Sequence, residues 1–427
     1  MRLTVVGGGS TYTPELVDGF ARLRDVLPVD ELVLVDPDSR RLELVGGMSR
    51  RMLARAGHPA RVLTTTDVDE GVRDSDVVLL QLRVGGQAAR DRDETWPLEC
   101  GCVGQETTGA GGFAKALRTV PVVLDIADRV RRLAAPGAWI VDFTNPVGIV
   151  TRALLGEGHR AVGLCNVAIG FERAFAQLLG VTPSEVQLDH AGLNHLTWIR
   201  QVTVAGVDHL PTLLAEHGQE LADRVEMPLS LLRGLGVVPS YYLRYFYEHD
   251  RVVAEQRTQG TRAAAVAAIE AELLALYADP TVDTKPAQLE ARGGAYYSEA
   301  AVALVASLLG DRRDVQVVNL RNDGTLPFLP DDAVIEVPAV IGAGGPAAVP
   351  VAPLDPLFAG LVAHVSAYES LALDAALRGG RHRVTKALLA HPLVGQLDRA
   401  DGLTDRLLAE NAAHLPWLTA GAPGGKR

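Results

Sequence analysis

The chain has 427 residues, of which 48% are hydrophobic and 22% are charged, and its formal net charge at pH 7 is −11. This composition is typical of a globular protein with one large α/β unit or two domains. The acidic surplus argues against a nucleic-acid-binding protein, which would carry a basic surface. It does not exclude a small anionic substrate, because a few arginines suffice to bind one phosphate.

The cysteines and the hydropathy pattern indicate the compartment. Cys100, Cys102 and Cys165 are too few, and odd in number, for a disulfide framework, which favours a reducing cytoplasm. The first predicted strand begins at Leu3, with no basic and apolar segment before it, so no signal peptide is expected. No uncharged apolar run approaches about 18 residues, so no membrane span is expected either.

The first 170 residues alternate between predicted strands and helices. We expect strands over residues 3–6, 31–35, 60–64, 76–82, 139–143 and 161–164, and helices over residues 15–27, 40–56 and 116–133. This alternation predicts a mostly parallel sheet with right-handed crossovers.

The pattern changes after about residue 170, so we expect two domains, residues 1–170 and 171–427. Residues 185–189 and 196–204 resemble antiparallel strands, and helices are expected over residues 262–277, 298–309, 356–373 and 384–390. Residues 341–353, rich in glycine, alanine and proline, predict a surface loop, and residues 420–427 a disordered tail. The expected fold is α/β: a Rossmann-like, doubly wound parallel sheet plus a C-terminal α+β domain, as in lactate and malate dehydrogenases.

A glycine-rich turn follows the first strand and opens a helix. Its residues are Gly7, Gly8, Gly9, Ser10 and Thr11. Glycines let backbone N–H groups approach a pyrophosphate, and the helix N-terminus adds partial positive charge. Asp36 ends the second strand, where a carboxylate can bind ribose hydroxyls and favour NAD over NADP. Tyr12 replaces the usual third glycine, and Asp36 lies further along than usual, but the strand–turn–helix context predicts NAD binding.

Several short stretches carry a more specific signal. They are residues 6–14; residues 83–86, 90 and 93–94; and residues 104–112, 144–146, 164–166, 192–195 and 239–243. In this order they resemble glycoside hydrolase family 4, specifically its 6-phospho-β-glucosidases, from the N-terminus to about Pro338 and more loosely beyond. The probability that so many separate motifs agree by chance in the same order is very small.

The resemblance implies an enzyme that uses NAD and a divalent metal, usually Mn²⁺. Its expected substrate is a phosphorylated disaccharide or β-glucoside, such as cellobiose 6-phosphate, cleaved to glucose 6-phosphate and an aglycone. In the family, hydride leaves sugar C3 for NAD, the C2 proton is removed, the C1–O bond breaks by elimination, water adds and the hydride returns; this differs from the two-carboxylate scheme. A homodimer or homotetramer is also expected.

The resemblance further implies roles for individual residues. Cys165 and His195 match the metal ligands, and thiolate and imidazole suit a transition metal. Tyr242 matches the general base, with Tyr241 as the competing candidate, and Glu106 matches a residue that tunes this tyrosine.

Other positions match substrate contacts. Arg90 and Arg262 match residues that hold the 6-phosphate and the sugar, with Arg83 and Arg292 as second candidates, and Asn145 matches a contact to a sugar hydroxyl. Asn166 stands where α-glucosidase members of the family have an aspartate that protonates the leaving group. Because asparagine cannot donate a proton as an acid, Asn166 implies β-linked substrates and leaves the leaving-group acid unidentified.

Alternative interpretations remain open at this point. A 6-phospho-β-galactosidase or a promiscuous 6-phosphoglycosidase would share all these motifs, since the C4 hydroxyl geometry cannot be read from sequence. An NAD-dependent 2-hydroxy-acid dehydrogenase or a noncatalytic redox-sensing module would have a similar fold. Both of these would leave Cys165, His195 and Tyr242 without a role.

Overall fold

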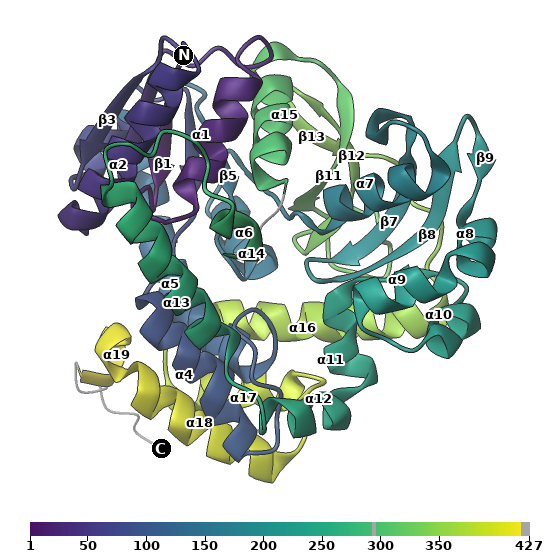
Figure 1. Ribbon diagram of the computed structural model, residues 1–427. Coiled ribbons are helices and arrows are strands. Elements are labelled where there is room, and N and C mark those ends of the chain that lie inside the picture. The colour runs from purple at the N-terminus through teal and green to yellow at the C-terminus, as the bar shows by residue number, and fades with distance from the viewer. Residues whose placement is uncertain (293–295, 420–427) are drawn as a thin grey trace.

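A computed structural model describes residues 1–292 and 296–419, so the tail expected at residues 420–427 lies outside the described residues. Within this part of the chain, thirteen strands form one sheet whose main order is β10-β8-β7-β12-β11-β6-β5-β4-β1-β2-β3. Two short strands complete it, since β13 pairs with β12 and β9 pairs with β8. Figure 1 shows the two halves of this sheet on opposite sides of the molecule.

One half of the sheet is parallel and has the order β3-β2-β1-β4-β5-β6. Its strands are Arg2–Val6 (β1), Glu31–Val35 (β2), Arg61–Thr65 (β3), Val77–Leu80 (β4), Trp139–Asp142 (β5) and Ala161–Gly163 (β6). All residues of β4 and β5 are buried, as expected for parallel strands covered on both faces. This strand order is that of a doubly wound dinucleotide-binding sheet, which confirms the predicted fold class.

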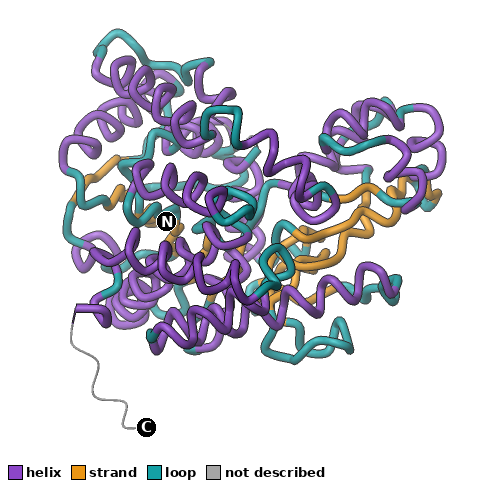
Figure 2. The backbone as a smooth tube through the Cα atoms, turned by 90° about the horizontal axis from the view of Figure 1, so that it is seen from below, coloured by secondary structure: helices purple, strands orange, loops and turns teal. Residues whose placement is uncertain are grey.

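Helices connect and cover these strands: Thr13–Arg22 (α1), Ser39–Arg55 (α2), Val68–Val72 (α3), Gly86–Glu99 (α4), Gly109–Leu133 (α5) and Val147–Gly156 (α6). In α2, the side chain of Asp38 accepts a hydrogen bond from the backbone N–H of Arg41 at 3.0 Å and caps the helix. Leu42, Val45 and Met48 then recur at helical spacing and are buried. The helices surround the strands in Figure 2.

The other half of the sheet is antiparallel and carries Gln187–Leu193 (β7), Leu196–Val204 (β8), Val207–Asp208 (β9), Val238–Pro239 (β10), Asp314–Arg321 (β11), Val334–Gly342 (β12) and Gly345–Ala348 (β13). β11 joins β6 at one pair, Asn319 opposite Gly163. The sheet therefore continues across residue 170, and the division into two domains there stays a prediction.

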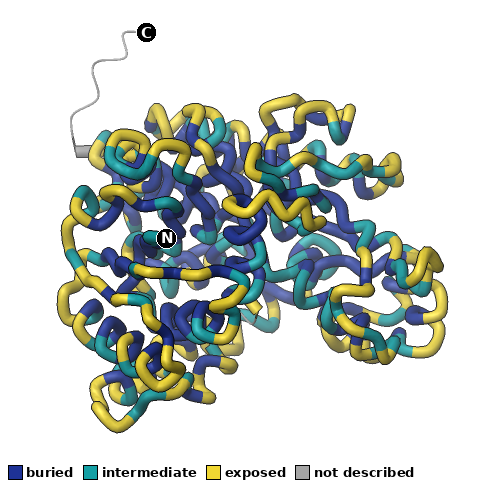
Figure 3. The backbone as a smooth tube through the Cα atoms, turned by 90° about the horizontal axis from the view of Figure 1, so that it is seen from above, coloured by how far each residue is buried: buried dark blue, intermediate teal, exposed yellow. Residues whose placement is uncertain are grey.

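The remaining helices cover both halves of the sheet. They are Val167–Leu179 (α7), Leu210–Glu216 (α8), Gly218–Val225 (α9), Leu229–Leu235 (α10), Arg244–Tyr247 (α11), His249–Gln256 (α12), Arg262–Ala278 (α13), Gln288–Arg292 (α14), Tyr297–Gly310 (α15), Pro356–Arg378 (α16), Arg381–Ala390 (α17), Leu397–Asn411 (α18) and Pro416–Thr419 (α19), with 3-10 turns at Pro183–Glu185, Tyr241–Leu243 and Ala412–His414. Helix α13 packs against α2 and α4, α15 packs against α1, and α17 and α18 lie at the lower edge of the molecule in Figure 1. Figure 3 shows buried backbone in the interior and exposed backbone around it.

The structure corrects several expected elements. The loop predicted over residues 341–353 is wrong in its first part, where β12 and β13 form a hairpin that pairs Ala339 with Ala348. Small residues there serve close packing, since Gly345 has φ +110° and lies against the ring of Trp139. The strand predicted over residues 185–189 starts at Gln187, because Glu185 belongs to a 3-10 turn. Helix α1 ends at Arg22, earlier than the predicted residue 27, and α5 begins at Gly109, earlier than the predicted residue 116. Several helices were not expected at all, among them α4, α6, α7 and α18.

Among the described helices, α16 is long and apolar enough, by length and composition, to cross a membrane. It packs against α5, α6 and α17. Its buried residues include Phe358, Val362 and Ala372, so much of its apolar surface belongs to the core of the protein.

Candidate active site

Two cavities meet at the carboxyl ends of the parallel strands, where ligands bind in sheets of this kind. The larger has a volume of about 970 Å³ and lies beside the glycine-rich turn. The smaller, of about 510 Å³, lies between the α4–α5 region and the segment from Tyr241 to Arg262. Both cavities are lined by Tyr12, Arg83, Asn145, Arg292 and Tyr297. These shared residues mark the junction at which two ligands would touch.

The glycine-rich turn and Asp36 form one unit at the larger cavity. The backbone N–H of Gly9 donates to Asp36 Oδ2 at 3.1 Å. A Cβ on Gly9 would lie 2.8 Å from the Asp36 carboxyl carbon, and Gly7, with φ +88°, would place a Cβ 2.6 Å from the carbonyl oxygen of Gln81. A side chain at Gly7 would therefore meet backbone in a left-handed conformation, and a side chain at Gly9 would displace the Asp36 carboxylate. Gly7, Ser10 and Asp36 line the cavity, so the predicted pyrophosphate and ribose contacts lie on one wall.

Gly8 and Thr11 anchor this wall of the cavity to the protein interior. The N–H of Gly8 donates to the carbonyl of Val35 at 2.9 Å. Thr11 is fully buried; its hydroxyl accepts from Arg292 Nε at 2.9 Å, and its carbonyl accepts from Tyr277 Oη at 2.7 Å. Thr11 therefore ties the turn to α13 and α14. The shape of this cavity suits a dinucleotide. The glycine turn leaves space for a pyrophosphate because it carries no side chains, and Asp36 places a carboxylate at the end of β2.

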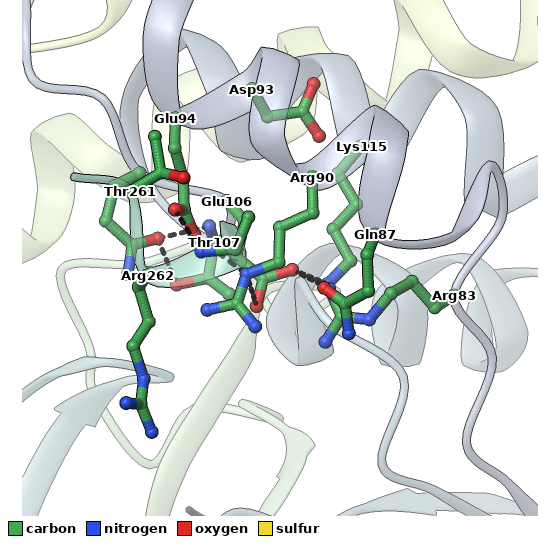
Figure 4. Close-up of polar contacts among 12 residues, drawn as sticks. Arg83, Gln87, Arg90, Asp93, Glu94, Glu106, Thr107, Lys115, Thr261 and Arg262 are labelled. Carbon is green, nitrogen blue, oxygen red and sulfur yellow. Dashed lines mark hydrogen bonds and ion pairs between the residues drawn. The ribbon is translucent and has the colours of Figure 1, made fainter. Parts of the chain in front are cut away.

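Glu106 is the centre of a buried charge cluster in the smaller cavity (Figure 4). Its carboxylate pairs with Arg83, with Lys115 Nζ at 2.7 Å and with Arg90 Nε at 3.2 Å. Burial raises the pKa of Glu106, but the positive charges of Arg83, Lys115 and Arg90 outweigh it and hold that pKa well below its usual range. Burial lowers the pKa of Lys115 to about 8, although Glu106 opposes this change. Glu106 is therefore an anion at neutral pH and cannot donate a proton.

Arg90 and Arg262, the predicted phosphate ligands, both line this cavity but differ in their contacts. Arg90 is held by Glu94 at 2.7 Å as well as by Glu106. Arg262 is exposed, donates to the carbonyl of Ala291 at 2.7 Å, and extends away from the Glu106 cluster in Figure 4. Glu94 also accepts from the N–H of Ala263 at 2.8 Å, so it joins α4 to the first turn of α13.

The predicted metal ligands come from the two halves of the sheet. Cys165 follows β6, and His195 lies in the two-residue turn between β7 and β8. Both are buried. Burial lowers the pKa of His195 to about 4 and raises the pKa of the Cys165 thiol. The imidazole is therefore neutral, and a metal would have to displace the thiol proton.

The orientation of His195 leaves one ring nitrogen available. The Thr107 hydroxyl donates to Gln105 Oε1 at 2.9 Å, so it accepts from His195 Nδ1, which lies 3.2 Å away. Nε2 then carries the lone pair that a metal needs. Within the described residues, no group of three or more His, Cys, Asp or Glu side chains is placed to hold a metal. The donor set fits a site that Cys165 and His195 share with ligand oxygens.

Tyr242 stacks on the metal-ligand candidate His195. The two ring centroids are 3.6 Å apart and the planes differ by 4°. Burial, followed by the charges of Cys165 and Glu106, raises the pKa of Tyr242, and Arg90 opposes the rise. Tyr241 lies edge-on to Tyr242 at 5.6 Å and receives a hydrogen bond from Arg244 Nη1 at 3.1 Å. Tyr242, with its ring on His195, is thus closer to the candidate metal ligands than Tyr241.

Asn145 and Asn166 both line the smaller cavity. Among the described residues, the buried side-chain oxygen of Asn145 has no hydrogen-bond partner, so it is ready to accept from a ligand hydroxyl. The peptide bond from Asn145 to Pro146 is cis. Asn166 is the N-cap residue of α7 and directly follows Cys165.

Some residues of this site were not predicted from the sequence. Lys115 is a lysine on an otherwise apolar helical stretch, which was its only signal, and it proves to be a direct partner of Glu106. Glu270 of α13 pairs with Arg292 at 2.9 Å and accepts from Gln87 at 3.0 Å across the larger cavity. Arg83 and Arg292, the second-rank candidates, lie at the junction of the two cavities.

Comparisons with known sequences place this geometry among glycosidases. The model of the Family 4 glycosyl hydrolase matches residues 2–181, and that of the Family 4 glycosyl hydrolase C-terminal domain matches residues 190–394. A probable 6-phospho-β-glucosidase of Bacillus subtilis is 39% identical, covering 97% of each chain. A 6-phospho-β-glucosidase of Escherichia coli is 36% identical over 98% of this chain and 96% of its own.

Solved structures agree. The 6-phospho-β-glucosidase of Thermotoga maritima with manganese, NAD⁺ and glucose 6-phosphate superposes with a TM-score of 0.90 at 33% identity, covering 97% of this chain and 99% of its own. The malate dehydrogenase of Salinibacter ruber reaches a TM-score of 0.53 at 21% identity over 88% of this chain and 98% of its own. The second likeness concerns the fold alone and agrees with the predicted dehydrogenase-like architecture.

Proposed function

The chain belongs to glycoside hydrolase family 4, as its motifs predicted, and we propose that it hydrolyses 6-phospho-β-glucosides with NAD and Mn²⁺ as cofactors. The products are glucose 6-phosphate and an aglycone. The relatives named 6-phospho-β-glucosidase, together with the bound NAD⁺, manganese and glucose 6-phosphate of the Thermotoga maritima enzyme, support this substrate and these cofactors.

One observation carries the proposal for this chain. The stacked pair of Tyr242 and His195 forms a wall of the smaller cavity, and that cavity meets the dinucleotide cavity at Asn145 and Arg83. A sugar in the smaller cavity can therefore face both the nicotinamide end of a dinucleotide and a metal at His195 and Cys165. A dehydrogenase fold provides the contact with the nicotinamide. The pair of Tyr242 and His195 adds the contact with a metal.

When bound, NAD⁺ would accept a hydride from the sugar reversibly, and the metal would supply a positive charge that stabilises negative charge developing on the sugar. Cys165 and His195 would hold the metal, and Gly7, Gly8, Gly9, Ser10, Thr11 and Asp36 would hold or support NAD. Tyr242 would remove the proton from C2. Since burial raises its pKa, Tyr242 needs a neighbouring positive charge to act near neutral pH.

The arginines of the smaller cavity would bind the anionic end of the substrate. Arg90 is rigid, because Glu94 and Glu106 hold its guanidinium, and it suits recognition of phosphate oxygens. Arg262 reaches the same cavity from the exposed start of α13. Asn145, with its unpartnered oxygen, would accept a bond from a sugar hydroxyl.

Each described glutamate that lines this cavity is held in an ion pair, so none is free to protonate the aglycone. The pairs join Glu94 to Arg90, Glu106 to Arg83, and Glu255 to Arg244. Asn166 cannot supply a proton either. We therefore propose that water protonates the leaving oxygen.

We also propose a cytoplasmic homodimer or homotetramer. The three cysteines are unpaired, which suits a reducing compartment. The helices α16, α17 and α18 expose large apolar side chains, which suit a subunit interface: Leu357, Leu377, Leu389 and Leu397.

An omission assay tests the proposed function. p-Nitrophenyl-β-D-glucoside 6-phosphate is incubated with the protein, NAD⁺, Mn²⁺ and a reductant, and each component is then left out. We expect p-nitrophenol release only with all of NAD⁺, metal and protein, and no net accumulation of NADH. Full turnover without NAD⁺ or without metal would contradict the proposal, and the matching galactoside determines the preference at C4.

A further inference from the structure

Glu336 is a buried carboxylate at the point where the two halves of the sheet meet. It lies on β12, is 1% exposed, and faces Gly192 of the neighbouring strand β7. Three side-chain nitrogens surround it at 2.9 Å: His190 Nε2 on one oxygen, and Asn194 Nδ2 and Asn319 Nδ2 on the other. A carboxylate suits this place, because it can accept several hydrogen bonds at once.

Each asparagine leads to one of the candidate metal ligands. Asn319 on β11 pairs with Gly163, two residues before Cys165. Asn194 directly precedes His195, and its side-chain nitrogen donates to Glu336. Glu336 is therefore connected to both ligands, although it lines neither cavity.

Close packing leaves this region little freedom to readjust. A Cβ on Gly163 would lie 2.9 Å from the Cβ of Asn319, and a Cβ on Gly192 would collide with the carbonyl oxygen of Leu196. His195 itself has φ +63°, which is a left-handed backbone conformation. A residue other than glycine keeps this conformation when its surroundings impose it. Beside it, the Asn194–Glu336 hydrogen bond supplies such a constraint.

We infer that Glu336 is a positioning residue for the metal site. Through Asn194 and Asn319 it holds the end of β6 and the turn between β7 and β8 in register, so that the Cys165 sulfur and His195 Nε2 converge on one cation. Residues that orient metal ligands commonly change metal affinity by about 10- to 100-fold when they are removed. The inference rests on the proposed function, which places the metal at Cys165 and His195.

Three variants test the inference by Mn²⁺ titration of the full chain with NAD⁺, with free Mn²⁺ measured by electron paramagnetic resonance. We expect Glu336→Ala and Asn194→Ala to weaken Mn²⁺ binding about 10- to 100-fold. Glu336→Gln should stay within about threefold of the parent, because its amide oxygen can accept from both asparagines while its N–H₂ donates to the other tautomer of His190. The control Glu15→Ala removes another buried carboxylate, one that contacts Ser298 and Lys285, and should leave Mn²⁺ affinity unchanged.

Each outcome separates the inference from the proposed function. If Cys165→Ser leaves Mn²⁺ binding intact, the metal site itself is wrong. If Cys165→Ser abolishes binding but Asn194→Ala binds Mn²⁺ like the parent, the metal site stands and the positioning role of Glu336 is refuted; this holds even if Glu336→Ala does not fold. Binding by Glu336→Gln as weak as that of a folded Glu336→Ala would also overturn the inference, since charge rather than placement would then be responsible.

Discussion

The two cavities bind their ligands by different physical means. The dinucleotide cavity combines a glycine turn, which leaves no space for a Cβ at Gly7, with the apolar side chains of Val6, Leu16 and Val35. Charged residues, among them Asp36 and Glu270, also line it. The sugar cavity is formed by charges and rings, since Arg83, Arg90, Arg244, Arg262 and Arg292 line it together with Tyr241 and Tyr242. The first selects its ligand mainly by shape, and the second by electrostatics and hydrogen bonds.

This contrast explains how a dehydrogenase-like fold can support a glycosidase. A cofactor that is regenerated within each turnover needs a stable cradle and no path for exchange in every cycle. The chemical specificity then lies in the second cavity, whose walls come from α4, the α4–α5 loop, the β7–β8 turn and the segment before α11. A substitution in one cavity should therefore alter the binding of one ligand and leave the binding of the other unchanged. The following predictions test this separation.

The largest effect is expected for Tyr242→Phe. In the proposed mechanism the phenolic oxygen of Tyr242 accepts the C2 proton, so its loss should lower kcat about 100- to 10,000-fold, as for loss of a general base. Binding of NAD⁺ and Mn²⁺, measured by calorimetry, should stay within a factor of about two, since the ring still stacks on His195. Tyr241→Phe is the matched control; if it loses as much activity while Tyr242→Phe stays active, the base is Tyr241.

The second prediction concerns the charge cluster of the sugar cavity. Glu106→Gln leaves Arg83, Arg90 and Lys115 without their shared anion, and breaking a buried ion pair on one side costs about 3–5 kcal/mol. We expect chemical denaturation to show a loss of this order. Substrate KM should change as well, while the affinity for NAD⁺ should not. An unchanged unfolding free energy would contradict the central place of Glu106 in the cluster.

The third prediction breaks the cradle of the other cavity. Gly9→Ala places a methyl group 2.8 Å from the Asp36 carboxyl carbon, so Asp36 must move away from its bond to the Gly9 N–H. Loss of one or two such contacts, at about 1–1.5 kcal/mol each, predicts NAD⁺ binding roughly 10-fold weaker. Binding of glucose 6-phosphate should be unaffected in the presence of saturating NAD⁺. Equal weakening of both ligands would mean that the two cavities are not separable.

The smallest effect is a pH dependence. The pKa of Glu106 is held well below its unfolded value of 4.5 by the three cations. Its contribution to stability is therefore complete above pH 4.5 and is lost as the pH falls through the lowered folded-state pKa. The stability difference between the parent and Glu106→Gln should shrink as the pH falls below 4.5, where Lys115 is charged in both proteins. A difference that grows on acidification would reverse the sign and refute the ion pairing.

Local patterns predicted the parallel half of the fold well, because buried strands and the glycine turn at Gly7 leave a mark in consecutive residues. The hairpin of β12 and β13 was missed, since its small residues look like a loop until Trp139 is seen packed against Gly345. The same holds for the site. Glu336 has partners far away in the chain, His190 and Asn194. Lys115 meets Glu106, nine residues before it, only because the loop before α5 folds back. No local pattern distinguishes Arg262, which donates to Ala291, from Arg83, which pairs with Glu106.

The most direct test of the proposed chemistry is the fate of the C2 hydrogen. A 6-phospho-β-glucoside is hydrolysed in D₂O, and the glucose 6-phosphate formed is analysed by ¹H NMR and mass spectrometry, with glucose 6-phosphate itself incubated alongside as the control. If Tyr242 removes the C2 proton and solvent replaces it, the product carries deuterium at C2 and the C3 hydrogen is retained. A product that keeps its original C2 hydrogen would mean direct displacement at C1 and would contradict the account.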